Sequence, residues 1–205
     1  MSDADVVGAI SQSEPTPEGF APFYYLRQGI RILFWDTDAV ARAAKDPRAL
    51  AYGAVFWIVA NLAVLLISIG THRPVRLDLG IVAFVLLFLP LAAALELARI
   101  GACHAIAAWF LGGDGNFVEL LRPLLLASIV LVAAAIPIGG IFLAGIPFVC
   151  VLCLAFQEVD HVEPLQSYIL CIVVSLIFTS LEGTLITSLA RAVATLGAGG
   201  GLSGR

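Results

Sequence analysis

Five apolar stretches follow one another between residues 50 and 189, separated by breaks that are polar or rich in glycine and proline. A helix of about 20 mostly apolar residues crosses the hydrocarbon core of a bilayer, and it satisfies its own backbone hydrogen bonds in lipid. The pattern therefore predicts an all-α fold, a polytopic integral membrane bundle of about five transmembrane helices. The predicted spans are residues 50–69, 80–111, 120–136, 141–156 and 165–189.

The amino-acid composition argues against a soluble protein. Hydrophobic residues make up 60% of the chain and charged residues only 13%, whereas a soluble domain carries about 25% charged residues. Lipid must therefore cover much of the exterior, and the bilayer is the first expected partner. No stripe of basic residues indicates binding to nucleic acid.

The two ends of the chain differ from its apolar middle. Residues 1–22 are rich in Ser, Glu, Pro and Asp, which predicts a disordered cytoplasmic tail. Residues 23–46 are predicted to form amphipathic juxtamembrane helices, and residues 47–196 the five-span membrane domain. The glycine-containing residues 197–205 predict a short flexible tail.

The juxtamembrane segment opens with an amphipathic pattern. Leu26, Ile30, Leu33 and Phe34 recur at helical spacing and define one face. Basic and aromatic residues flank this face, as in helices that lie in the membrane interface. The same face could instead pack on the transmembrane bundle or on a partner. The candidate contacts to a partner or to the membrane surface are Arg27, Ile30, Arg31, Phe34 and Trp35.

Two aspartates mark the starts of the next helices. Asp36 or Thr37 can cap a short second helix, because a side-chain oxygen there accepts a hydrogen bond from an unsatisfied backbone N–H. Asp46 is a good N-cap, and Pro47 fits the first helical turn, where its missing N–H costs nothing. This pair predicts the start of the helix that carries the first span.

The distribution of lysine and arginine predicts the orientation, because these residues are enriched in cytoplasmic loops. Six basic residues are predicted on the N-terminal side of the membrane and four on the other: Arg27, Arg31, Arg42, Lys45, Arg48 and Arg122 against Arg73, Arg76, Arg191 and Arg205. The asymmetry favours a cytoplasmic N-terminus and an external C-terminus. Lys45 is the single lysine, and such an excess of arginine favours a bacterial source and hence the bacterial cytoplasmic membrane.

Charged residues inside apolar helices are costly and need an explanation. Glu96 and Arg99 lie three residues apart on the second helix, so their side chains can meet. We expect a structural ion pair at the cytoplasmic boundary of a crossing that ends near Leu97. The alternative is a polar cavity or relay in which Arg99 also meets Glu182, although Glu182 is predicted nearer the external half. The candidate intramembrane or interfacial polar residues are Glu96, Arg99, His104 and Glu182.

Other groups of reactive residues have simpler interpretations. Cys150 and Cys153 form a C-x-x-C inside an apolar helix, where a thiolate is disfavoured and no second pair completes a metal site. The loop with Asp160, His161 and Glu163 is typical of a solvated loop more than of a cation site. His104 with Asp114 and Glu119 is the one candidate set for a lipid-modifying enzyme. We therefore predict no catalytic, cofactor-binding or metal site, and no enzyme.

From His104 onward the chain resembles the Yip family of five-span membrane proteins. The resemblance rests on His104-x-x-Ala107, then Gly112-Gly113-x-Gly115-x-Phe117, then Arg122 and a span closing in Pro137. It extends over about residues 46–196. It implies a five-span fold with a cytoplasmic N-terminal region and an external C-terminus. It also implies a membrane scaffold or adaptor, and it supplies no active site.

Two functions remain after this reasoning. The first is a non-enzymatic membrane scaffold or adaptor that recruits other membrane proteins, associates with itself or organises the membrane. Runs of small residues on the predicted helices would allow such close packing. The alternative is a small transporter or channel, as a single chain or an oligomer, indicated by the polar residues in the spans and by Pro90 and Pro147, which are expected to interrupt helices.

Overall fold

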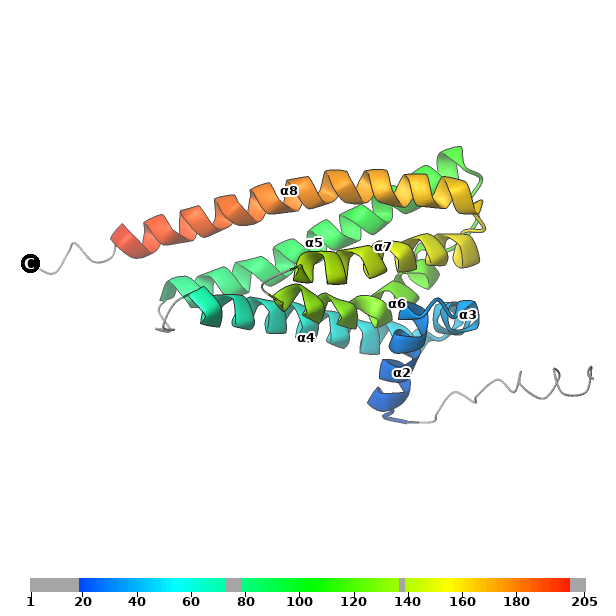
Figure 1. Ribbon diagram of the computed structural model, residues 1–205, viewed down its shortest axis with the longest axis horizontal. Helices are drawn as coiled ribbons and strands as arrows, with labels where there is room; N and C mark the ends of the chain where they lie inside the picture. The colour runs from blue at the N-terminus through cyan, green and yellow to red at the C-terminus, as the bar shows by residue number, and fades with distance from the viewer. Residues whose placement is uncertain (1–18, 73–78, 137–138, 200–205) are drawn as a thin grey trace, which may run out of the picture.

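The computed structural model describes residues 19–72, 79–136 and 139–199. Within these ranges the chain is helical and contains no strand, which confirms the all-α prediction. The elements are α2 (Pro22–Leu33), α3 (Thr37–Lys45), α4 (Pro47–His72), α5 (Leu79–Phe110), α6 (Phe117–Ala127), the 3-10 helix η1 (Ser128–Ala135), α7 (Gly140–Val159) and α8 (Pro164–Gly199) (Figure 1).

Five segments of the described residues are long and apolar enough to cross a membrane, as the sequence predicted. They are Pro47–Ile67, Phe84–Phe110, Phe117–Ala135, Phe142–Val159 and Pro164–Leu189. The third segment changes from α6 into η1 at Ser128 and so is not one continuous α-helix. These findings make the chain an integral membrane protein by the length and composition of its helices.

The first two membrane helices begin and end close to where the sequence predicts. The first begins at Pro47, directly after its predicted cap. The second is Leu79–Phe110, and neither Pro90 inside it nor Pro147 inside α7 ends its helix, although the sequence had suggested that they would. The last continues to Gly199, so residues 197–199 are helical, not part of a flexible tail. Residues 1–18 and 200–205, where we predicted tails, and the loop 73–78 lie outside the described residues.

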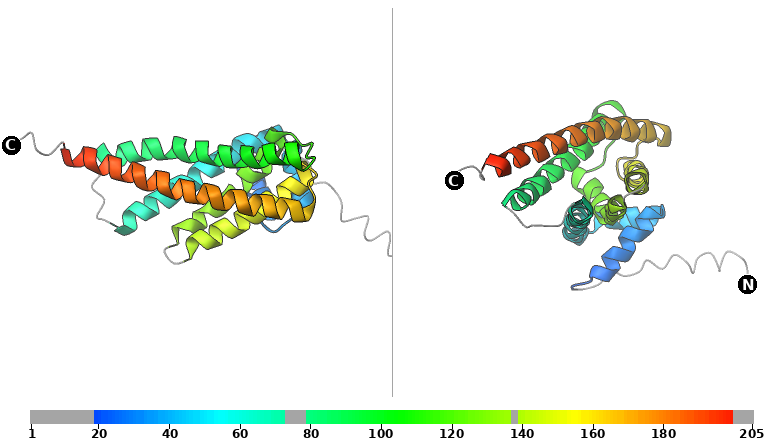
Figure 2. Two further views of the ribbon diagram at one scale, coloured as in Figure 1. Left: turned by 90° about the horizontal axis from the view of Figure 1, so that it is seen from above. Right: turned by 60° about the vertical axis from the view of Figure 1, so that its left-hand side comes forward.

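The long helices lie side by side in the order α4, α6–η1, α7, α8, α5. The third segment packs against α4 on one side and α7 on the other, α7 packs against α8, and α8 packs against α5. Figures 1 and 2 show α8 and α5 as a long pair and α4 at the opposite edge, beneath α6 and η1. The short helices α2 and α3 gather at one end, which is also where α7 ends and α8 begins (Figure 1).

The best-packed part of the core lies at this same end. The fully buried side chains there include Tyr25 and Ile32 of α2, Val40 of α3, Leu124 of α6 and Phe156 of α7. Large apolar side chains of α4, α5 and α8 remain exposed along the helices, as expected for surfaces that contact lipid. The two N-terminal helices are therefore part of the folded core. We call α2 and α3, with the turn between them, the juxtamembrane platform (residues 22–45).

Both predicted helix caps are present. Oδ1 of Asp36 accepts a hydrogen bond from the backbone N–H of Ala39 at 2.9 Å, which makes Asp36, not Thr37, the cap of α3. Oδ1 of Asp46 accepts one from the N–H of Arg48, also at 2.9 Å, at the start of α4. The caps separate α2, α3 and α4 with connections short enough to fold the platform back onto the bundle.

Candidate functional site

Helix α2 runs across the end of the bundle and not along it (Figures 1 and 2). Its inner face packs mainly on α6, and also contacts α3, α4 and α7. Gly29 allows this close approach, because a Cβ at this position would lie 2.5 Å from the carbonyl oxygen of Leu126. The buried residues of α2 are Tyr25, Gln28, Gly29 and Ile32.

The outer face of α2 remains exposed although it is apolar. Phe23 and Phe34 are each 83% exposed, Trp35 is 62% exposed and Ile30 43%. Arg27 is exposed on the same helix. The platform therefore presents aromatic and aliphatic side chains beside a basic residue, at the end of the membrane-spanning helices. Such a surface suits a membrane interface or a protein partner.

The residues of the predicted apolar stripe of α2 differ in their exposure. Ile30 and Phe34 are exposed, whereas Leu26 and Leu33 are half-buried, and Leu33 packs against the core. The helix instead packs through the line of Tyr25, Gly29 and Ile32. The hydrophobic pattern does not reveal this second line, because a glycine interrupts it, and the same glycine permits the close contact with α6.

Arg31 forms an ion pair inside the platform. Its Nε donates a hydrogen bond of 2.7 Å to Oδ2 of Asp36, and the two groups form an ion pair. Burial raises the pKa of Asp36, but the hydrogen bond from Ala39 and the pairing with Arg31 outweigh it and hold that pKa below its ordinary value. Arg31 therefore closes the turn between α2 and α3, while its role as a surface contact stays a prediction.

Tyrosines and an arginine fasten the platform to the bundle. The hydroxyl of Tyr25 donates a 2.7 Å hydrogen bond to Oδ2 of Asp46, and its ring stacks on Tyr52 of α4 with centroids 4.1 Å apart. The hydroxyl of Tyr52 accepts a hydrogen bond from the N–H of Ala21 at 2.9 Å. Arg122 of α6 donates to the carbonyl oxygen of Ala44. The platform is thus fixed at both of its ends.

The charged residues of the spans meet between α5 and α8. Nη2 of Arg99 lies 2.6 Å from Oε1 of Glu96, with side chains 12% and 15% exposed, and the guanidinium lies 5.0 Å from the centre of the Phe148 ring. Glu182 of α8 interacts electrostatically with both. The pair lies within the apolar segment Phe84–Phe110. Its expected place at the cytoplasmic boundary of the membrane stays a prediction.

Two histidine–aspartate pairs link α5, the loop after it and the end of α7. Nδ1 of His104 lies 3.0 Å from Oδ2 of Asp160, whose side chain is fully buried. Nδ1 of the exposed His161 lies 2.7 Å from Oδ1 of Asp114. Burial raises the pKa of Asp160, with His104 acting in the opposite direction. Asp160 was expected in a solvated loop, but it anchors that loop beneath α5.

The cysteines behave as small apolar side chains. Cys103, Cys153 and Cys171 are each fully buried in the core, and Cys171 interacts with the other two. All four cysteines are free thiols. Among the described residues no group of three His, Cys, Asp or Glu side chains is arranged to hold a metal ion.

No protein-family model, no curated protein and no solved structure matches the chain. The candidate sites therefore rest on geometry: the juxtamembrane platform with its exposed apolar face, and the Glu96–Arg99 pair with Glu182.

Proposed function

We propose that the chain is a non-enzymatic membrane scaffold or adaptor of the Yip type that recruits partner proteins through the juxtamembrane platform. In this proposal it resides in the bacterial cytoplasmic membrane, with the platform and N-terminus on the cytoplasmic side and the C-terminus outside. The observation that carries the proposal is the outer face of α2, with Phe23, Ile30 and Phe34 exposed beside Arg27 on a helix whose inner face is buried.

The platform is suited to this task because its shape does not depend on a partner. Tyr25 and Ile32 are held in the core, at 1% and 0% exposure, while the outer residues of the same helix remain uncovered. A preorganised aromatic surface loses little conformational freedom on binding, so more of the contact energy appears as affinity. Aromatic and arginine side chains are also the residues that dominate the affinity of protein interfaces.

Photo-crosslinking in native membranes tests the proposal. A photoreactive amino acid at Phe34 samples the outer face, and the same probe at Phe142, which is 68% exposed near the start of α7, serves as the matched control. We expect one reproducible protein adduct from position 34 and none from position 142. Replacing Phe23 and Ile30 with serine should abolish the adduct at position 34 without changing the helix content.

This design is preferable to deletion of residues 23–45. Such a deletion removes Tyr25, Ile32 and Val40 from the core, so a lost adduct would report unfolding. The surface substitutions leave the inner face intact. If position 34 yields only lipid adducts and adducts to a second copy of the chain, the adaptor proposal fails.

A small transporter or channel, formed by one chain or by an oligomer, is the second candidate. It is favoured by the Glu96–Arg99 pair and Glu182, which bring three charges together between α5 and α8. Charges inside membrane spans often mark pathways for ions or substrates. Ion flux into proteoliposomes that is lost in the folded Glu182→Gln variant would support it. Absence of flux for every ion tested would count against it.

A further inference from the structure

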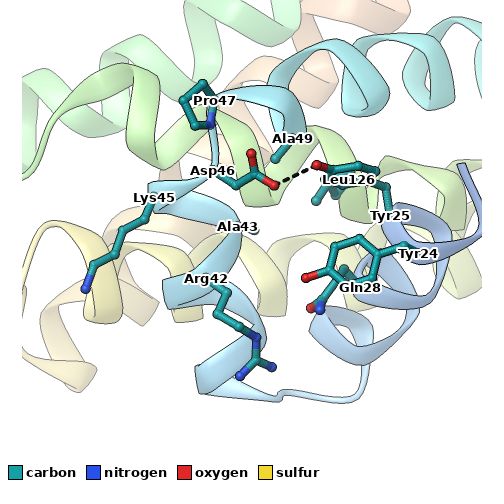
Figure 3. A pocket seen from close by; sticks show the side chains of 10 residues that line it. All are labelled: Tyr24, Tyr25, Gln28, Arg42, Ala43, Lys45, Asp46, Pro47, Ala49 and Leu126. Carbon is teal, nitrogen blue, oxygen red and sulfur yellow. Dashed lines mark hydrogen bonds between the residues drawn. The ribbon is translucent and has the colours of Figure 1, made fainter. Parts of the chain in front are cut away.

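A pocket of about 320 Å³ lies between the platform and the start of α4. Helix α2 contributes Tyr24 and Gln28 to its lining, α3 contributes Arg42 and Lys45, and Leu126 of α6 lies at its apolar side (Figure 3). The volume is within the range of about 300–1,000 Å³ that is typical of small-ligand sites.

Arg42 contributes two hydrogen-bond donors that lack a partner. Its Nε and Nη2 atoms are both shielded from solvent, and neither contacts an acceptor within the part of the chain that the structure describes. These two N–H groups point in the same direction from the planar guanidinium and form a fork. Two oxygens of a phosphate or carboxylate fit such a fork with parallel hydrogen bonds. A buried charged fork left without an acceptor is costly, so this arrangement calls for an anion.

Gln28 contributes a hydrogen-bond acceptor that likewise lacks a partner among the described residues. The residue is 4% exposed, and its Oε1 is buried without a donor among the described residues. Figure 3 shows the side chains of Gln28 and Arg42 on the same side of the pocket, with the hydroxyl of Tyr24 nearby. The pocket therefore requires both an anionic group, for Arg42, and a hydrogen-bond donor, for Gln28.

The remaining charges leave the pocket open to an anion. Asp46 also lines it, but its two oxygens accept hydrogen bonds from the Tyr25 hydroxyl and from the N–H of Arg48. Asp36 attracts Arg42 electrostatically, but its two oxygens already accept hydrogen bonds from Arg31 and from the N–H of Ala39. The side chain of Lys45 is exposed and extends away from Gln28 and Tyr24, which adds positive potential at the outside of the pocket (Figure 3).

We propose that this pocket binds the headgroup of a membrane phospholipid, with the phosphodiester on the fork of Arg42 and an ammonium or hydroxyl of the headgroup on Oε1 of Gln28. Phosphoethanolamine and phosphoglycerol headgroups contain both features. The location favours a lipid over a soluble phosphate, because the platform lies where the membrane helices end and its outer face is apolar. The inference does not depend on the adaptor function, since lipid binding requires no protein partner.

Native mass spectrometry of the full-length protein in a non-phospholipid detergent tests this inference. The probes are a short-chain phosphatidylethanolamine, glycerophosphoethanolamine and inorganic phosphate. We expect one tightly retained lipid per chain, and at least about tenfold weaker binding for Arg42→Gln, since the fork accounts for the charge-assisted bonds. Arg42→Lys should retain part of the affinity, because it keeps the charge and loses the fork.

The matched control is Arg191→Gln, which removes the same charge from an exposed position on α8, outside the pocket. Its lipid affinity should equal that of the original protein. Thermal unfolding of each variant shows whether it is folded, and Gln28→Leu tests the pocket independently through the acceptor. Equal retention of lipid by Arg42→Gln, or no one-to-one lipid adduct of the original protein, would overturn the inference. Binding of inorganic phosphate as tight as that of the lipid would overturn the assignment to a headgroup.

Discussion

The hydroxyl of Tyr25 donates a 2.7 Å hydrogen bond to Oδ2 of Asp46 and so joins the middle of α2 to the junction between α3 and α4. Tyr25 is 1% exposed. Asp46 caps the first membrane helix with its other oxygen. One carboxylate therefore connects the position of the platform to the start of the first span, and both proposals above depend on that position.

Tyr25→Phe should weaken the attachment of the platform. The variant keeps the ring stack on Tyr52 but leaves Oδ2 of Asp46 without its donor, so we expect a loss of about 1 kcal/mol in the free energy of unfolding. The measurement is reversible unfolding in mixed detergent micelles, followed by circular dichroism. Tyr24→Phe is the control, because Tyr24 packs edge-on against Tyr25 and has no resolved link to Asp46. Equal stability of Tyr25→Phe and the original protein would show that the bond contributes nothing.

The same bond predicts a response to alkaline pH. Burial, and then the hydrogen bond to Asp46, raise the pKa of Tyr25 above its ordinary value. The folded state then holds this proton when the unfolded chain has lost it. Stability should be complete below the ordinary tyrosine pKa of about 10 and should decrease as the pH rises above it. In Tyr25→Phe this decrease should be smaller, and an identical pH profile would contradict the assignment.

Gly29→Ala should displace α2 from the bundle. The added Cβ would lie 2.5 Å from the carbonyl oxygen of Leu126, a backbone atom that cannot rotate away. We expect a loss of about 1–3 kcal/mol in the free energy of unfolding, as for other overpacked sites. Gly101→Ala is the matched control, because its Cβ would be 3.9 Å from the ring of Phe117, which is ordinary contact. Alanine stabilises a helix relative to glycine by up to about 1 kcal/mol, so the control should be neutral or more stable.

The close contact at Gly29 illustrates which features of the fold the sequence could predict and which it could not. The five spans and the caps Asp36 and Asp46 were predictable because apolar runs and capping residues are local signals. The packing face of α2 was not, because it depends on where Leu126 lies, almost a hundred residues later in the chain. Periodicity identified an apolar stripe through Ile30 and Phe34, and this stripe is the exposed one.

In the candidate site, too, local features were predictable from the sequence and contacts between distant residues were not. The proximity of Glu96 and Arg99 follows from their spacing on one helix, and the sequence predicted it. Their interaction with Glu182 depends on how α5 packs against α8, which the spacing of residues along one helix does not encode. The burial of Asp160 depends on the fold of its loop beneath His104, which loop composition does not encode. The pocket at Arg42 and Gln28 is lined by α3 and α2. The sequence pattern did not predict which faces of these two helices point towards each other.

Asp114→Asn should change the titration of His161. The hydrogen bond from His161 and its charge lower the pKa of Asp114, and the same contact raises the pKa of His161 above its ordinary value. We expect the NMR titration of the His161 ring to move down towards about 6.5 in the variant. The support that this pair gives the loop is present below the ordinary histidine pKa and is lost as the pH rises through the raised value. An unchanged titration would mean that the two side chains do not meet.

Arg99→Ala should destabilise the membrane domain far more than Glu182→Gln. Removing the guanidinium leaves the carboxylates of Glu96 and Glu182 close together inside the spans with no positive charge, and breaking a buried pair in this way costs about 3 kcal/mol or more. Removing the charge of Glu182 leaves the Glu96–Arg99 pair intact, so that variant should remain near the original stability. The double variant Glu96→Gln, Arg99→Gln removes both charges of the pair and should recover most of the loss. The free energy of unfolding by a denaturing detergent, measured for all three variants, distinguishes these expectations. If Arg99→Ala is as stable as Glu182→Gln, the three charges do not interact. The structural argument for an ion pathway between α5 and α8 then fails.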